Sequence, residues 1–344
     1  MTGATRPGAN GADPFERAAP PVAGVTAVVL THKRPRLAGE VTRALIDVEG
    51  VDPDRVLVVV NGSGGLDDPD LEAAVRTVRL DRNLGPAGGF RAGLVEAFAD
   101  RATRWAYLCE DDVGLFSLPG PRVARLVARL ESSAAETTTR DGSPVGAVVA
   151  YGRRFVGRGA HTVNVVPERD DPRAFSPVDV ACWGATLVAR SVVDAGVLPD
   201  PTWFFGLEDF DFFCRVRSAG FSVLLDVQAA RQVAAEQTAE GRERVLGGRR
   251  PTDKDEPWRA YYHARNSVTL ARRHGRPDWH AWHLLYSARR LQLASGRAER
   301  LAIAHGLWDG ARGRMGEHPR YGRSLGELAP DPSPGRGPVL PPEA

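Results

Sequence analysis

The sequence predicts an α/β fold built on a mostly parallel sheet with helices on both faces. Short apolar runs rich in β-branched residues alternate with segments whose apolar residues recur at helical spacing. A polar cluster follows each of the early runs. Such alternation is typical of sheets whose parallel strands are joined by helices. A final run of helical patterns adds a C-terminal helical appendage.

The first part of the chain is expected to supply two buried strands and the helix between them. Residues 25–30 and 56–60 are continuous apolar runs, which indicates strands buried on both faces. Pro35 suits the first turn of a helix. Apolar residues then follow at helical spacing, at positions 37, 41, 45 and 48.

Two further strands are expected before residue 112. Residues 75–80 form a third candidate, and residues 83–89 form a glycine-rich loop that leads into a helix with apolar residues at 90, 94, 97 and 98. Residues 105–109 form a fourth apolar strand, which runs directly into Glu110, Asp111 and Asp112.

The second half is less regular. Residues 145–150 and 221–225 are expected to be strands, and residues 208–219 a helix. Residues 153–177 are polar and arginine-rich, which predicts a long loop. Residues 178–188 are apolar with a break at Trp183 and Gly184.

Four regions are expected along the chain. Residues 1–23 and 323–344 are rich in small residues and proline and lack periodicity, which predicts disordered tails. Residues 24–256 form the α/β domain. Residues 257–322 form a helical region, with helical patterns at 258–274 and 278–315.

Composition and charge exclude several classes of protein. The formal net charge is +2, from 45 basic and 43 acidic residues, which argues against a dedicated nucleic-acid-binding protein. Cys109, Cys182 and Cys214 lie far apart in apolar runs, which predicts free thiols in a reducing compartment and no zinc site. The sequence shows no signal-like segment and no membrane-spanning apolar run, so the expected location is the cytoplasm.

The polar clusters are expected to converge. They follow the strands at positions 31–32, 61–63, 83–89 and 110–112. The carboxyl ends of parallel strands share one edge of the sheet, and ligands of such sheets bind there. Four separate loops are therefore expected to line one crevice.

The acidic triplet at 110–112 has the chemistry of a cation site. Carboxylate oxygens are the ligands that Mg²⁺ and Mn²⁺ prefer, and such a cation can stabilise charge on a phosphate leaving group. Taken alone, the triplet is better explained as an acidic turn that ends a strand.

Taken together, these segments resemble glycosyltransferase family 2, whose members have the GT-A nucleotide-sugar-binding fold. The resemblance is carried by Thr-His-Lys-Arg-Pro at 31–35, Arg-Asn-Leu-Gly-Pro-Ala-Gly-Gly-Phe at 82–90 and Trp-Ala-Tyr-Leu-Cys-Glu-Asp-Asp at 105–112. It extends from residue 25 to about residue 266 and is closest to bacterial galactofuranosyltransferases and rhamnosyltransferases. It implies inverting transfer of a hexose from a UDP- or dTDP-linked donor to a cell-envelope glycan or lipid-linked acceptor, with Mg²⁺ or Mn²⁺ as cofactor.

The resemblance also implies roles for individual residues. Glu110 and Asp112 match the acidic ends of the family's Asp-x-Asp signature and are the implied metal ligands. Family members often have aspartate in place of Asn61, so recognition of the base is expected to differ. The implied donor-binding residues are Thr31, His32, Arg34, Asn61, Asn83, Gly88, Gly89, Glu110, Asp111 and Trp183.

A second acidic cluster begins at Glu208 and Asp209. An inverting transfer needs a carboxylate that accepts the proton of the acceptor hydroxyl. The resemblance aligns Asp209 with that base, and Glu208 is the second candidate. Asp211 and Arg215 lie four residues apart on the predicted helix, so an ion pair is expected.

Several aromatic residues near these acids have two interpretations. Those at positions 203–205 either stack on sugar rings or fill the core. Trp183 lies either under the sugar or in ordinary sheet packing.

One position departs from the family pattern. Many members have a metal-binding histidine after the strand equivalent to residues 221–225, but the nearest candidate here is Gln232. Another ligand replaces the histidine, or activity is weakened or lost. A non-catalytic nucleotide-sugar-binding protein is therefore one alternative. A nucleotidyltransferase is another, although the turn at 31–35 lacks the glycine that such an enzyme is expected to have there.

The helical region leaves two questions open. Arg265 lies in a Tyr-x-x-Arg-Asn segment similar to one in galactofuranosyltransferases, and it either reaches a phosphate or is a solvated residue on a packed helix. Residues 279–300 interleave tryptophan, tyrosine and leucine with arginine. This stretch either lies on an anionic membrane surface or packs on the α/β domain.

Overall fold

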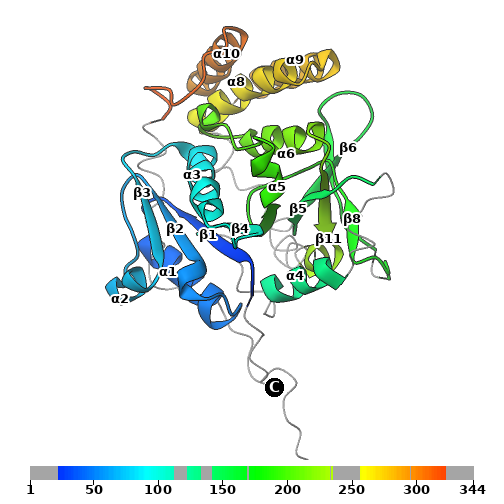
Figure 1. Cartoon of the computed structure of the whole chain (residues 1–344). Coiled ribbons are helices and arrows are strands. Elements are labelled where there is room, and N and C mark those ends of the chain that lie inside the picture. The colour runs from blue at the N-terminus through cyan, green and yellow to red at the C-terminus, as the bar shows by residue number, and fades with distance from the viewer. Residues whose placement is uncertain are drawn as a thin grey trace, which may run out of the picture.

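The computed structural model describes residues 22–111, 122–132, 142–168, 170–232, 234, 256–294 and 296–322. Within these residues an eight-stranded sheet runs in the order β3-β2-β1-β4-β10-β5-β11-β8 (Figure 1). The parallel strands on one side are β1 (Val25–Thr31), β2 (Val56–Asn61), β3 (Arg76–Leu80) and β4 (Trp105–Glu110). The prediction of a mostly parallel sheet is confirmed.

The other side of the sheet mixes directions. β5 (Val145–Val149) and β11 (Ser222–Asp226) are parallel to each other. β10 (Thr186–Ala189) is antiparallel to both β4 and β5 and joins the two halves of the sheet. β8 (Phe175–Pro177) is antiparallel to β11 at the edge.

Side chains alternate across β1 and bury both faces of the sheet. Val28 and Leu30 contribute to one hydrophobic cluster, and Ala27 and Val29 to the other. The first cluster is closed by α3 (Gly85–Ala99), α5 (Arg190–Asp194) and α6 (Glu208–Ser218). The second is closed by α1 (Pro35–Asp47) and α4 (Arg122–Ser132). A short helix, α2 (Pro69–Ala74), links β2 to β3.

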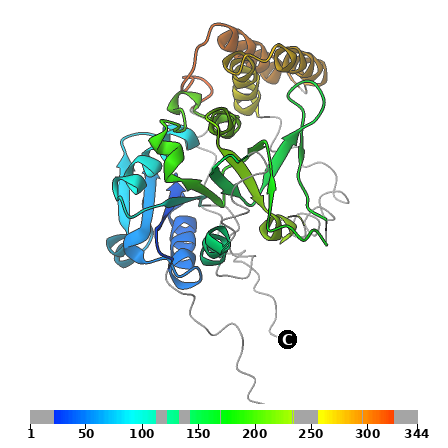
Figure 2. The same ribbon diagram turned by 45° about the vertical axis from the view of Figure 1, so that its right-hand side comes forward.

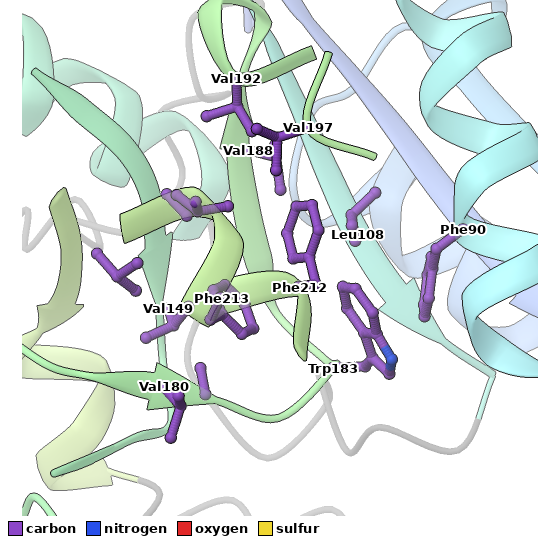
Figure 3. Packing of buried hydrophobic residues seen from close by; sticks show 14 of the residues in the cluster. Phe90, Leu108, Val149, Val180, Trp183, Val188, Val192, Val197, Phe212 and Phe213 are labelled. Atoms are coloured by element: carbon purple, nitrogen blue, oxygen red, sulfur yellow. The ribbon is translucent and has the colours of Figure 1, made fainter. Parts of the chain in front are cut away.

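Glycines bring α3 close to the sheet. A Cβ atom added at Gly89 would lie 2.2 Å from Leu30 Cδ1, and one added at Gly93 would lie 2.4 Å from Val28 Cγ1. Trp183 packs near this helix, with ring centroids 4.9 Å from Phe90 and 5.4 Å from Phe212 (Figure 3). These contacts agree with the interpretation of Trp183 as a packing residue, and a contact of Trp183 with the donor stays a prediction.

The prediction of a long loop at 153–177 is wrong. β6 (Gly152–Phe155) pairs with β7 (Thr162–Asn164) and with β9 (Val180–Ala181), and β8 lies near the end of the same segment. Several residues of β6 and β7 are partly or fully exposed. Strands with a solvated face lack the continuous apolar run on which the prediction relied.

The described residues after 256 form three helices, and Figures 1 and 2 show them stacked at one end of the molecule beyond α3 and α6. They are α8 (Pro257–Arg273), α9 (Pro277–Leu293) and α10 (Arg297–Ala311). The helical pattern at 278–315 is thus divided, because Ala294 and Gly296 have extended backbone. Gly306 and Gly310 let α10 pack closely on α8, where an added Cβ would meet the carbonyl oxygens of Tyr261 and Arg265.

None of the helices in the described ranges is both long enough and apolar enough to cross a membrane. The three cysteines are free, as expected. Cys109 and Cys214 are buried, whereas Cys182 is partly exposed.

Truncation of the core on α3 tests this packing. Phe90 is fully buried, so Phe90→Ala is expected to lower the free energy of unfolding by about 3–5 kcal/mol through lost burial and a residual cavity. Urea denaturation followed by circular dichroism measures this change. The matched control is Val95→Ala on the same helix, where the side chain is 53% exposed and the expected change is about 0.5 kcal/mol or less. Equal effects of the two substitutions would contradict the packing.

Candidate functional site

Asp111 ties the end of β4 to the turn after β1. The hydroxyl of Thr31 donates a hydrogen bond to Asp111 Oδ2 at 2.7 Å, and Arg34 forms an ion pair with Asp111 Oδ1. Asp111 is 1% exposed, and its backbone N–H donates to Leu30 O at 3.1 Å. Three expected donor-binding residues therefore meet, although both Asp111 oxygens have partners within the protein.

Asn61 organises the loop at 83–85. Its Nδ2 donates to Asn83 Oδ1 and to Gly85 O, both at 3.0 Å, and its Oδ1 accepts from Leu84 N–H at 2.8 Å. Asn61 is 3% exposed. The two residues are brought together as expected, but the amide of Asn61 is largely committed to the loop. A direct contact of Asn61 with the donor stays a prediction.

His32 joins the same group. Its Nδ1 lies 2.6 Å from Asn61 O, so the ring must donate there, because a carbonyl oxygen only accepts. Burial lowers the pKa of His32 below its usual value, against the opposing effect of this hydrogen bond. The neutral ring then leaves Nε2 as an acceptor, and this atom is buried without a hydrogen-bond partner.

Glycines 85, 88 and 89 lie against different parts of the protein, so a side chain is excluded at each for a different reason. An added Cβ at Gly88 would lie 2.3 Å from Leu84 Cβ, so packing alone explains glycine there, as it does at Gly89. Gly85 has φ +71°, and its added Cβ would lie 1.7 Å from Phe204 O. The backbone at Gly85 therefore approaches another part of the protein. Donor contacts of Gly88 and Gly89 stay predictions.

A cluster of acids lies between β4 and α6. Glu208 is 6% exposed, and burial raises its pKa well above the usual value; the charges of Asp209 and Glu110 raise it further. Burial also raises the pKa of Asp209 to about 6. Phe210 N–H donates to Asp209 Oδ1 at 2.8 Å, which opposes this increase. A pKa of about 6 leaves the Asp209 carboxyl group mostly ionised at neutral pH.

Three other residues modify the acid cluster. The indole of Trp183 lies near enough to Glu208 to favour its charged form, although neither Glu208 Oε2 nor Trp183 Nε1 makes a hydrogen bond of normal geometry. The thiol of Cys182 and the charge of Arg153 both lower the pKa of Asp209. Arg153 lies in β6 and Cys182 directly follows β9, and neither position carries a local sequence motif that predicts a contact with Asp209.

The expected metal site is only partly within the described residues. Asp112 lies outside them, whereas Glu110 ends β4. Carboxylates such as that of Glu110 are the ligands that Mg²⁺ and Mn²⁺ prefer, so the chemistry of this position fits a divalent cation. No group of three histidine, cysteine, aspartate or glutamate side chains within the described ranges is arranged to hold a metal. Gln232 lies in the helix at 227–232 that follows β11.

Arg265 is neither solvated nor open to a phosphate. It is 1% exposed, and it donates to Trp203 O at 2.7 Å and to Asn266 Oδ1 at 2.8 Å. Helical spacing could not show this, because the carbonyl group that it contacts lies more than 60 residues away. The expected pair of Asp211 and Arg215 is confirmed at 2.9 Å.

The aromatic residues at 203–205 pack within the protein. Trp203 and Phe204 are buried. Phe205 is partly buried and lies 4.8 Å from Trp258 between ring centroids. These contacts agree with the interpretation that the aromatic residues fill the core.

Comparison with known proteins gives short sequence matches. No model of a known protein family matches the chain. A stretch of 96 residues is 38% identical to galactofuranosyltransferase GlfT1 of Mycobacterium tuberculosis, covering 26% of this chain and 30% of that protein. A stretch of 89 residues is 36% identical to ribosomal RNA small subunit methyltransferase A of Streptomyces avermitilis, with the same coverage. The chain spans less than a third of either relative, and their activities differ.

Similar solved structures include GalNAc-T7 with UDP, GalNAc and Mn²⁺, at 12% identity and a TM-score of 0.43 over 79% of this chain and 57% of that one. The mannosyltransferase PcManGT from Pyrobaculum calidifontis with GDP-Man and Mn²⁺ is 14% identical, with a TM-score of 0.40 over 89% and 84% of the two chains. TM-scores below 0.5 do not establish a common fold.

Replacement of Asp209 tests its burial. Its pKa is higher in the fold than in the unfolded chain, so this carboxyl group lowers stability as pH rises from about 4 through about 6. Asp209→Asn is therefore expected to raise the melting temperature at pH 7.5 by roughly 2–4 °C, with a smaller gain toward pH 4. Thermal unfolding at several pH values measures this.

The control for this prediction is an acid with a lowered pKa. Arg276 lowers the pKa of Asp278 well below its usual range, so Asp278→Asn is expected to give no gain in melting temperature at pH 7.5. An unchanged or lower melting temperature for Asp209→Asn at pH 7.5 would show that the Asp209 charge is well stabilised.

Proposed function

We propose that this protein is a metal-dependent inverting glycosyltransferase of the GT-A type, which moves a hexose from a nucleotide-sugar donor to an acceptor hydroxyl. The supporting observation is Asp209, a carboxyl group that adjoins Glu208 in the acid cluster and whose pKa is raised by burial to about 6. A general base works best with a pKa near the working pH. Asp209 has this property, and it lies close to the carboxyl end of a central parallel strand.

The donor is proposed to lie beyond the carboxyl ends of β1, β2 and β4. Ligands of open parallel sheets bind at such ends, and Thr31, His32, Arg34, Asn61 and Asn83 gather there. Asp112 and Glu110 would hold Mg²⁺ or Mn²⁺, whose chemistry when bound is to stabilise negative charge on the leaving nucleoside diphosphate.

The acid cluster would carry out the proton transfer. Asp209 accepts the proton of the acceptor hydroxyl as that oxygen attacks the sugar. Glu208 remains the second candidate, and burial with the nearby charges of Asp209 and Glu110 raises its pKa well above the usual value. The buried ring of Trp183 lies beside Glu208 in this cluster.

Galactofuranose from a UDP-linked donor is the first choice of sugar, and rhamnose from a dTDP-linked donor is the second. The partial identity with a galactofuranosyltransferase supports this order. The proposed acceptor is a cell-envelope glycan or a lipid-linked glycan, reached from the cytoplasm.

The outer surface of α9 and α10 supports a lipid-linked acceptor. Large apolar side chains are exposed on these helices: Leu284, Leu285, Tyr286, Leu293, Leu301 and Trp308. Arg289, Arg297 and Arg300 are exposed among them. Apolar side chains flanked by arginine favour a helix that lies on an anionic membrane. We therefore propose peripheral binding through this surface.

Release of nucleoside diphosphate tests the activity. Wild-type protein is expected to release UDP or dTDP from one donor of a panel that includes UDP-galactofuranose and dTDP-rhamnose, with Mn²⁺ or Mg²⁺ but not with EDTA. The rate is expected to fall below about pH 6 as Asp209 becomes protonated. Asp209→Asn should lower turnover about 10²-fold or more with nearly unchanged donor binding, and Asp112→Ala should remove the metal dependence of donor binding.

The control for this assay is Asp70→Asn, an exposed acid on α2 that should leave turnover unchanged. Turnover of Asp209→Asn at the wild-type rate would exclude Asp209 as the base. If calorimetry detects donor binding but no donor releases its nucleoside diphosphate, the protein is a non-catalytic nucleotide-sugar-binding protein and not an enzyme.

Vesicle binding tests the α9–α10 surface. Wild-type protein is expected to cosediment with phosphatidylglycerol-containing vesicles and not with phosphatidylcholine alone. Leu285→Asp combined with Leu293→Asp should weaken this binding about 10-fold or more, because the two side chains are 72% and 66% exposed and each substitution removes apolar contact. Val95→Asp, at an exposed apolar position of α3, is the control. Equal binding of the double variant and wild type would exclude the surface.

A further inference from the structure

The turn that precedes Glu208 and Asp209 has an unusual backbone. Phe204 has φ 62° and ψ −58°, and Phe205 N–H donates to Trp203 O at 2.8 Å. These values define a γ-turn with positive φ, which is rare and strained. Leu207 follows in the left-handed region with φ 65° and ψ 5°. Such residues persist only where the surrounding structure determines them.

Asn266 of α8 holds the middle of this turn. Its Nδ2 donates to Phe205 O at 2.7 Å and to Gly206 O at 2.6 Å. Asn266 is 0% exposed, so water cannot replace these hydrogen bonds. The amide group therefore fixes two successive carbonyl groups immediately before α6.

Arg265 holds the start of the turn. Its Nη2 donates to Trp203 O, the same oxygen that closes the γ-turn, at 2.7 Å. Its Nε donates to Asn266 Oδ1 at 2.8 Å, which orients the Asn266 amide so that Nδ2 faces the turn. The two side chains thus act as one unit.

The burial of the Arg265 guanidinium is expected to cost stability compared with an apolar side chain at the same position. No ion pair in the described part of the chain includes Arg265; its guanidinium contacts carbonyl and amide oxygens and lies 4.7 Å from the centroid of the Tyr262 ring. A buried charge without an opposite charge is unfavourable unless its hydrogen bonds are satisfied. A neutral apolar residue would pack α8 without this requirement, but it could not hold the turn.

Gly85 closes the other side of the turn. The oxygen of Phe204 occupies the space that a side chain at position 85 would need. Gly85 O in turn accepts from Asn61 Nδ2 at 3.0 Å. The turn therefore lies between α8 and the loop that Asn61 organises, and α6 begins directly after it at Glu208.

We propose that Arg265 and Asn266 are positioning residues, which hold the turn at 203–207 so that the first residues of α6 place the Asp209 carboxylate in the acid cluster. The inference rests on the proposed function of Asp209 as base. Neither side chain is proposed to touch a substrate. Loss of their hydrogen bonds would let the turn relax and α6 begin with a different orientation of its first carboxylates.

Two readouts test the proposal in full-length protein. The first is the NMR titration of the Asp209 side chain, labelled with ¹³C and assigned with Asp209→Asn. The wild-type midpoint is expected near pH 6. Asn266→Asp should shift this midpoint by about one pH unit, because a carboxylate only accepts hydrogen bonds and cannot bind the two carbonyl oxygens of the turn.

The second readout is turnover. Asn266→Asp should lower kcat about 10–10²-fold with KM for the donor nearly unchanged. Arg265→Lys, which retains a single donor group, should show smaller effects in the same directions.

The control is Glu299→Gln, which weakens the pair that Glu299 forms with Arg290 at 2.6 Å between α9 and α10 and leaves the turn untouched. It should lower the melting temperature without moving the Asp209 midpoint or kcat. An unchanged midpoint in Asn266→Asp and Arg265→Lys would overturn the positioning role, as would equal shifts in Glu299→Gln. If wild-type protein turns over no donor, the proposed activity fails. A shift of the Asp209 midpoint in Asn266→Asp and Arg265→Lys relative to wild type would still support the positioning role in that case.

Discussion

The approach of Gly85 to the carbonyl group of Phe204 is the contact on which the candidate site depends. It joins two segments of separate origin: the loop that Asn61 holds at the end of β2, and the turn that leads into α6. The first carries the proposed donor side and the second carries the acids. Because the contact is between backbone atoms, no rotamer change can adjust it. The spacing between the two sides is set by the absence of a single Cβ atom.

The acids at the start of α6 illustrate a conflict between stability and function. Glu208 and Asp209 are less readily ionised in the fold than in water, since burial disfavours the charged forms. The positive φ values at Phe204 and Leu207 add strain directly before them. A fold selected only for stability would avoid both features. They persist because α8 and α3 enclose the turn from two sides, and such over-determined strain is typical of functional sites.

The C-terminal helices therefore do more than cover the sheet. The inner side of α8 holds the turn through two buried polar residues, while the outer surfaces of α9 and α10 expose leucine, tyrosine and tryptophan beside arginine. Helix α8 thus contacts the turn that precedes the proposed catalytic acids, whereas α9 and α10 carry the surface proposed to bind a membrane. A lipid-linked acceptor bound at that surface would lie on the same helical region that holds the turn before Asp209.

The sequence by itself determined the buried strands and the acidic segments that follow β4 and begin α6. Continuous apolar runs and carboxylates that interrupt them are local signals, because burial on both faces leaves no room for polar residues. It did not reveal β6, β7 and β8, whose solvated faces carry polar residues. It also did not reveal that Arg265 is buried and donates to the carbonyl group of Trp203. The tertiary structure alone decided that Asn61 braces a loop, that Gly85 meets Phe204, and that Asp209 has a raised pKa. Each of these features depends on contacts between residues that are far apart in the chain. Neither the hydropathy pattern nor the spacing of residues in the sequence predicts how close such residues lie in the fold.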